Sequence, residues 1–270
     1  MFDGVRCPCI LLQLIATGKP LSTAGMMIED RTRTYTIAME RTVVPENFSF
    51  RMTDEEYRVL EKIKNSIPVC YLADHADFAL GIVTGNNKKF LSAEKTEHSE
   101  MVLKGTDICK YHINPVKQYL RFEPEQFQQV APLEIYRAPE KLLYRFISNQ
   151  LVVAYDDRQM LSLNSCNIVI PKIEGMQIKY ILAILNSSVS QFVYQKEFHS
   201  IKVLRAHMEH IPIPRVGKAI QNEIIAMTEP LICGMGKEAA ETCQKRLDCR
   251  IMDLFRLSAE EQWIIRHALH

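Results

Sequence analysis

The spacing of apolar residues changes along the chain and predicts different structures for its beginning, middle and end. The first 50 residues carry two strand-like apolar runs, at 6–15 and 34–39, joined by turns rich in glycine, proline, serine and threonine. No earlier strands are available to pair with these runs. We therefore expect residues 1–50 to be the closing edge of a domain whose body lies upstream.

The middle of the chain alternates short apolar runs with turns. Between residues 69 and 171, Gly-Asn-Asn and Tyr-Asp-Asp-Arg turns separate runs of β-favouring residues. The clearest runs lie at 79–84, 142–146, 151–155 and 167–170. This pattern predicts a strand-rich region.

Helices are predicted on both sides of that region. Thr53 and Glu56 form a capping box that opens a helix running to about residue 64. A buried helix is predicted at 176–185, and the Asn-Ser-Ser sequence that follows ends it and caps a second helix through about residue 196. The Ile-Pro-Ile-Pro sequence at 211–214 must be extended, because each proline disfavours a helical predecessor.

The last fifty residues are predicted to be mostly helical. One helix covers 219–228 and stops near Pro230, and a capping box at Ser258 opens a short final helix. Between Ala240 and Leu254 the apolar residues step by three and four, which makes an amphipathic seam. The seam either packs on its own chain, which we prefer, or docks a partner helix and gives a homodimer through the C-terminal helices.

Composition is that of an ordinary globular protein, with 270 residues, 47% apolar and 24% charged. The eight cysteines are scattered without a Cys-x-x-Cys pair, which favours reduced thiols in a cytoplasmic protein and no metal site. The apolar opening run is too short to span a membrane, which needs roughly 20 residues, and it lacks the features of a signal sequence.

Charge is nearly balanced over the whole chain but not locally. The net charge is +1, whereas residues 101–122 and 194–218 each carry three more cations than anions. Two basic stretches on a neutral chain suit a one-sided DNA groove, although solvated surface produces the same pattern.

Sequence motifs of catalysis are missing. The sequence has no glycine-rich phosphate loop, no Gly-x-Ser-x-Gly and no His-Glu-x-x-His. It also lacks the Asp/Asn-Pro-Pro-Tyr/Phe tetrapeptide with which adenine methyltransferases hold a flipped base. This favours a binding module without catalytic residues.

Several blocks carry a family resemblance. The sequence Gly-Ile-Val-Thr-Gly-Asn-Asn-Lys-Lys-Phe at 81–90 resembles the Gly-Ile-x-Thr-Gly-x-Asn-x-x-Phe signature of the TaqI-like C-terminal specificity domain, found in type IIG restriction–modification enzymes and adenine methyltransferases. Further blocks in the family's order lie at 103–111, 141–145, 154–157, 180–187, 211–214 and 247–261.

The resemblance implies the fold and the role of the chain. The fold class is α+β, a strand-rich target-recognition domain with packed helices and a C-terminal helical tail. Its divisions would be 1–50 as the remnant of a methyltransferase domain, 51–216 as the specificity domain and 217–270 as the tail. Partners would be double-stranded DNA and an upstream methyltransferase domain, in which alone S-adenosylmethionine is expected.

The turn that follows residue 83 is the first candidate contact to DNA. Glycine at position 85 permits close approach, asparagine can bond adenine through two hydrogen bonds, and lysine neutralises phosphate. Alternatively, the turn belongs to a hairpin whose asparagines merely tolerate left-handed dihedral angles. The candidate residues are Thr84, Asn86, Asn87, Lys88 and Lys89.

A second candidate contact lies at a later turn. Arg145 can pair with the O6 and N7 atoms of guanine, and Ser148 and Asn149 follow it in the sequence. Arg145 could instead pair with Asp156 or Asp157 across a hairpin.

The remaining candidates are polar or basic. Ser162 and Asn164 can bond bases or phosphates, although a polar strand face explains them as well. Lys196, Lys202 and Arg205 lie between a predicted helix and the proline block, where the one-sided charge suits phosphate contacts.

Overall fold

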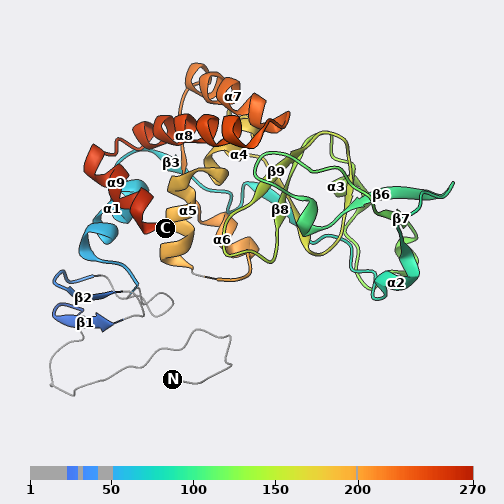
Figure 1. Cartoon of the computed structure of the whole chain (residues 1–270), viewed down its shortest axis with the longest axis horizontal. Coiled ribbons are helices and arrows are strands. Elements are labelled where there is room, and N and C mark those ends of the chain that lie inside the picture. The colour runs from blue at the N-terminus through green and yellow to red at the C-terminus, as the bar shows by residue number, and fades with distance from the viewer. Residues whose placement is uncertain (1–22, 30–32, 42–50, 199, 270) are drawn as a thin grey trace. The chain divides into compact units, whose positions relative to one another are not determined.

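The computed structural model describes residues 23–29, 33–41, 51–198 and 200–269 (Figure 1). The chain divides into two compact units, Met1–Phe48 and Ser49–His270. In the first unit β1 (Met26–Glu29) and β2 (Thr34–Ile37) pair as an antiparallel hairpin. The strand predicted at 34–39 is therefore present as β2, and the strand predicted at 6–15 lies outside the described residues.

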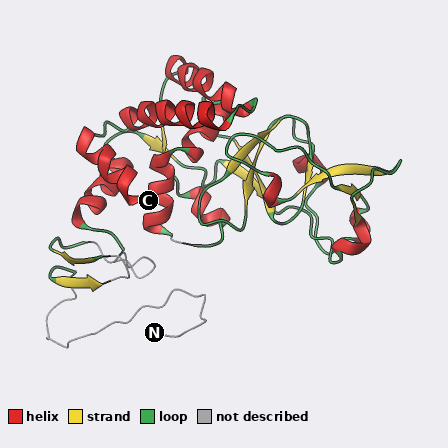
Figure 2. Ribbon diagram, in the orientation of Figure 1, coloured by secondary structure: helices red, strands yellow, loops and turns green. Residues whose placement is uncertain are grey.

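Two four-stranded sheets make up the strand-rich part of the second unit (Figure 2). The first is antiparallel, with the strand order β4 (Ala76–Ala79), β11 (Cys166–Pro171), β8 (Lys141–Arg145) and β9 (Val153–Asp156). The second has the order β10 (Leu161–Ser162), β6 (Ser99–Leu103), β7 (Tyr119–Arg121) and β5 (Leu91–Ser92), with β10 parallel to β6. A separate pair joins β3 (Val69–Cys70) to β12 (Ile213–Pro214), so the proline block is extended as predicted.

The strand predicted at 79–84 is displaced toward the N-terminus. β4 ends at Ala79, and the chain then crosses to the other sheet through single bridges that join Ile82 to Leu163 and Val83 to Gln129. A Cβ atom on Gly81 would lie 2.1 Å from the carbonyl oxygen of Leu163. Glycine is therefore required where the two segments cross.

The helices before the tail begin where capping residues predict. α1 (Asp54–Asn65) has the Thr53–Glu56 capping box. The Ser187 hydroxyl accepts a hydrogen bond from the Ser190 amide and so separates α4 (Ile178–Asn186) from α5 (Ser188–Glu197). Shorter helical segments are α2 (Asn87–Phe90), α3 (Leu133–Tyr136), α6 (Arg205–Glu209) and the 3-10 turns Gly105–Asp107 and Pro124–Gln126.

The tail consists of α7 (Lys218–Ile232), α8 (Lys237–Leu254) and α9 (Ala259–Ala268). The prediction that the first of these helices stops near Pro230 was wrong, because α7 continues through Pro230 to Ile232. A proline so close to the end of a helix removes only one backbone hydrogen bond, which a packed helix tolerates.

The tail shares the main hydrophobic core of the second unit. Leu247 and Ile251 of α8 are fully buried in the same cluster as Leu182 of α4 and Phe192 of α5. The amphipathic seam therefore packs on its own chain. The fold is α+β, with a strand-rich part, packed helices and a helical tail. Among the described residues, no helix combines the length and apolar character needed to cross a membrane.

Candidate nucleic-acid interface

Side chains of the 84–89 turn hold its shape. The buried Thr84 hydroxyl donates a 2.6 Å hydrogen bond to the Asn87 side-chain oxygen. The Asn86 side chain caps α2 by accepting from the Lys89 amide at 3.3 Å, and Gly85 has a φ angle of +75°. The asparagines thus use oxygen atoms to build the turn. Both residues remain exposed, so their amide nitrogens face solvent.

The two lysines of the turn differ in the contacts that their side chains make. The Lys89 ammonium group lies 3.0 Å from the Gln126 side-chain oxygen and 4.7 Å from the centre of the Phe90 ring. Lys88 is exposed and forms no ion pair with any residue in the described ranges. Lys88 is therefore the freer of the two cations.

A backbone network connects this turn to the other predicted contacts. The Ile82 amide donates to the Ser162 carbonyl at 2.7 Å, and the Asn164 amide donates to the Ile82 carbonyl at 3.1 Å. One residue on, the Ser165 carbonyl accepts from the Phe146 amide at 3.0 Å. The exposed Asn164 therefore lies between the turn and the segment that follows β8.

Arg145 is half-buried and stabilises a neighbouring loop. Its guanidinium donates to the carbonyl oxygen of Gly105 at 2.9 Å and to that of Ile108. It does not pair with Asp156, which binds Lys141 instead. One terminal nitrogen of Arg145 has no hydrogen bond within the described part of the chain. Recognition of a base by Arg145 stays a prediction, and it would have to use that nitrogen.

Residues 146–148 pair with 201–203 and bring four predicted contacts together. The Ser148 amide donates to the Ile201 carbonyl at 3.0 Å, and exposed Asn149 follows. On the facing segment, Lys202 is exposed, and its ammonium group lies 5.8 Å from the centre of the Phe146 ring. Arg205 opens α6 and pairs with Glu209 at 2.7 Å. In Figure 1, α2 and α6 lie toward the two ends of the strand-rich part, with β8 and β9 between them.

Two predicted contacts are withdrawn. Ser162 is fully buried in β10, so its hydroxyl cannot reach DNA in this structure. Lys196 is only 8% exposed in its side chain and forms a 2.8 Å ion pair with Glu56. Glu56 lies 140 residues away from Lys196 in the sequence. A count of charges in neighbouring residues therefore could not show that Lys196 belongs to a buried ion pair and not to the surface.

The structure adds a segment that the sequence analysis missed. Gln128 lies next to the 84–89 turn, since a Cβ atom on Gly85 would lie 3.4 Å from the Gln128 Cβ atom. Gln129 forms two backbone hydrogen bonds with Val83, at 2.9 and 3.1 Å. Exposed glutamine can bond adenine as asparagine does. The adjacent glutamines at 128 and 129 were a detectable signal, but only the fold places them beside the turn.

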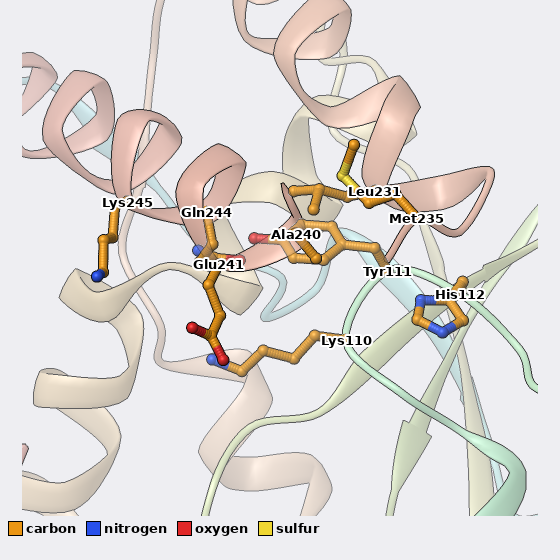
Figure 3. Close-up of a pocket in the computed structure, with 9 residues that line it drawn as sticks. All are labelled: Lys110, Tyr111, His112, Leu231, Met235, Ala240, Glu241, Gln244 and Lys245. Carbon is orange, nitrogen blue, oxygen red and sulfur yellow. The ribbon is translucent and has the colours of Figure 1, made fainter. Parts of the chain in front are cut away.

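A pocket of about 350 Å³ lies where loop 110–112 meets α7 and α8 (Figure 3). Burial lowers the pKa of Lys110, whose ammonium donates to the Asn186 carbonyl at 3.1 Å. Burial raises the pKa of Asp248 on α8, which accepts from the Ser188 amide at 2.8 Å. None of the predicted DNA contacts lines the pocket. The bond from Ser188 to Asp248 attaches α8 of the tail to α5. No cluster of three potential metal ligands occurs among the residues that the structure describes.

The chain resembles known proteins mainly through its fold. It is 10% identical to the type IIL restriction–modification enzyme MmeI solved in complex with DNA, with a TM-score of 0.50 over 74% of this chain and 35% of that one. The HsdS subunit from Thermoanaerobacter tengcongensis is 14% identical, with a TM-score of 0.40 over 80% and 50% of the two chains. A chain of a type I restriction–modification complex is 12% identical, with a TM-score of 0.43 over 80% and 52%.

This chain therefore spans about half or less of the length of these solved structures. None of the curated proteins matches it. The sequence model of one family does match. The match covers most of the sequence blocks that carry the family resemblance, from β6 to the proline block, but it does not include the signature at 81–90. Residues 100–213 of this chain match the model of the TaqI-like C-terminal specificity domain family.

Proposed function

We propose that this chain recognises a specific sequence in double-stranded DNA on behalf of a site-specific adenine-N6 methyltransferase or a type IIG restriction–modification enzyme. The observation that carries the proposal is the hydrogen-bonded network from the 84–89 turn to α6, which holds exposed amide and cationic side chains on connected loops. The specificity-domain match supports it. The MmeI structure, solved with DNA, supports the fold on which it rests.

The two kinds of side chain have different tasks in this proposal. Lys88, Lys202 and Arg205 contact phosphates, which orients the module and supplies affinity for any sequence. The amides of Asn86 and Asn87 lie on the turn that reaches base edges in the major groove, where an amide discriminates adenine through paired hydrogen bonds. Ser148, Asn149 and Asn164 are further candidate contacts.

The chemistry of methyl transfer belongs to another domain in this proposal. S-adenosylmethionine would bind there, and this chain would bring that domain to its DNA target. We propose the division 1–50 as the closing edge of the methyltransferase domain, 51–216 as the specificity domain and 217–270 as its helical tail.

The proposal is tested by selecting duplexes from a randomised pool with the full chain. We expect enrichment of one short motif and binding that weakens steeply with salt, because neutralised phosphates release counterions. A pool that yields no bound duplex at low salt would contradict DNA recognition. Bound duplexes without a shared motif would leave only non-specific binding.

The first variant to measure is Lys88→Ala. We expect weaker binding to all duplexes and a slope of log affinity against log salt that is smaller by about 1, because one phosphate contact is lost. Lys237→Ala, which removes an exposed lysine at the start of α8, is the matched control and should leave the slope unchanged. Equal slopes for Lys88→Ala and wild type would remove this lysine from the interface.

Base recognition is tested separately with Asn86→Ser. Serine preserves the cap of α2 and removes the amide, so the fold is maintained while one base contact is lost. We expect discrimination at a single A·T pair to fall by about 1–3 kcal/mol, measured by competition between duplexes that differ at each position. Asn65→Ser, on the exposed end of α1, is the control. An unchanged preference at every position would exclude Asn86 from base recognition.

The alternative of a module that dimerises through its C-terminal helices receives no support from the surface of the tail. The amphipathic seam is already buried against α4 and α5. In the described part of the tail, Met235 and Trp263 are the exposed large hydrophobic residues, and the exposed side chains of α8 are mainly charged. A stable helical interface would need an apolar stripe.

A further inference from the structure

A second exposed segment, residues 126–129, is fixed against the 84–89 turn. Gln129 exchanges two backbone hydrogen bonds with Val83, at 2.9 and 3.1 Å. The Phe127 ring also lies edge-on to the phenyl ring of α2, with 5.2 Å between the two centres. Backbone bonds and ring packing therefore hold the 126–129 segment in one position beside the turn.

The three glutamines of this segment differ in what their side chains already bind. The amide oxygen of Gln126 accepts from the Lys89 ammonium at 3.0 Å, and its amide nitrogen donates to the Glu123 carboxylate at 2.8 Å. Gln128 and Gln129 are exposed, and their side chains form no hydrogen bond with any residue in the described part of the chain. The amide groups of Gln128 and Gln129 are thus available to a ligand, whereas that of Gln126 is not.

The Gln128 side chain lies along the turn. A Cβ atom on Gly85 would lie 3.4 Å from the Gln128 Cβ atom and 3.7 Å from the Gln128 amide oxygen. Since consecutive Cα atoms are about 3.8 Å apart, the Gln128 Cβ atom also lies within about 9 Å of the Asn86 Cα atom. Successive base pairs of a duplex are about 3.4 Å apart. The side chains of Asn86 and Gln128 can therefore reach base pairs that are neighbours or nearly so.

The chemistry of a free carboxamide favours adenine over the other bases. Its oxygen accepts and its nitrogen donates, which matches the N6 donor and the N7 acceptor that adenine presents in the major groove. Guanine presents two acceptors there, so a carboxamide can satisfy only one of them. A phosphate attracts a neutral amide less than a cation, and the turn already supplies the cation of Lys88.

We infer that Gln128 reads a second adenine, at a base pair no more than about three positions from the pair that Asn86 reads. The recognised motif would then contain two A·T pairs that are close together, one for each segment. This inference rests on the proposed function, and it assigns a base contact to a residue outside the 84–89 turn.

The test is competition between duplexes that carry the selected motif with one base pair changed at a time. For Gln128→Ala we expect discrimination at one A·T pair to fall by roughly 5- to 150-fold, within three positions of the pair affected by Asn86→Ser. Wild type should bind more weakly when 7-deazaadenine, which lacks N7 but still pairs with thymine, replaces that adenine. Gln128→Ala should bind the two duplexes equally, because the contact to N7 is already gone.

The adjacent variant Gln129→Ala decides which glutamine is the reader. It removes an exposed amide of the same type and keeps the backbone bonds to Val83, so we expect the wild-type preference at every position. A loss of discrimination in Gln129→Ala but not in Gln128→Ala would overturn the assignment to Gln128. Urea unfolding should be the same for both variants as for wild type, since both side chains are exposed.

The remaining outcomes separate this inference from the proposed function. If Gln128→Ala weakens binding to all duplexes equally, Gln128 contacts the DNA backbone or supports the turn, and base reading is overturned. An unchanged preference at every position, or a loss at a pair far from that of Asn86, would also overturn it. In each of these cases wild type still binds its motif, so the proposed function stands. If wild type selects no motif at all, the proposed function itself fails.

Discussion

Replacing Asp156 with alanine is expected to lower the free energy of unfolding by about 3–5 kcal/mol, because it leaves the Lys141 ammonium buried without its counter-ion. The side chains of Lys141 and Asp156 are 0% exposed and their charged atoms are 2.5 Å apart. Asp156 also accepts from the amides of Arg158 and Met160, at 2.9 and 3.0 Å, so alanine would leave those amides unpaired as well. The variant should melt about 10 °C below wild type.

The environment of Lys141 explains why the pair matters. Burial lowers the pKa of Lys141, and the nearby Asp156 opposes that shift. The ammonium also donates to the Tyr136 carbonyl at 2.6 Å, which connects β8 to α3. Lys141 and Asp156 lie opposite each other on β8 and β9, so the pair joins a central strand of the first sheet to its edge strand.

Urea unfolding measures the prediction, with a surface ion pair as control. Lys172 and Asp77 are 59% and 41% exposed and lie 2.5 Å apart, so Lys172→Ala should cost less than about 1 kcal/mol. The double variant Asp156→Leu with Lys141→Met should be more stable than either single variant, since it removes both buried charges. If Asp156→Ala lowers the free energy of unfolding by less than about 1 kcal/mol, the Lys141 charge must be stabilised in the variant by entering water or by a shift of the surrounding structure.

The second large effect is expected for Gly81→Ala. The added methyl group would lie 2.1 Å from the Leu163 carbonyl oxygen and 2.7 Å from the Cys166 carbonyl oxygen. Both atoms belong to the backbone and cannot rotate away. We expect a loss of about 3 kcal/mol, because one of the two segments must shift to relieve the overlap.

Gly81→Ala should also weaken DNA binding beyond its effect on stability. Ile82 connects the 84–89 turn to the 162–165 segment through two backbone hydrogen bonds, so a shift at residue 81 misplaces the turn. Gly217→Ala, where no atom lies within 4 Å of the added carbon, is the control and should lose no more than about 1 kcal/mol. Unchanged unfolding and binding in Gly81→Ala would mean that the crossing is looser than the structure shows.

The sequence determined the local features of the fold. The capping boxes at Thr53 and Ser258, the break at Ser187 and the extended proline block all follow from interactions within a few residues. The amphipathic seam of α8 was likewise visible, since a helix buries residues at a period of 3.6. The family blocks between residues 100 and 213 were recognisable from their residues and from the order in which they occur.

Only the tertiary structure decided which polar residues are available for DNA. Lys196 and Lys202 look alike in the sequence, yet one forms a buried ion pair with Glu56 and the other is exposed. Arg145 binds carbonyl groups about forty residues away, and residues 146–148 pair with residues 201–203. Burial and pairing depend on contacts between distant segments, which local propensity and charge counts do not contain.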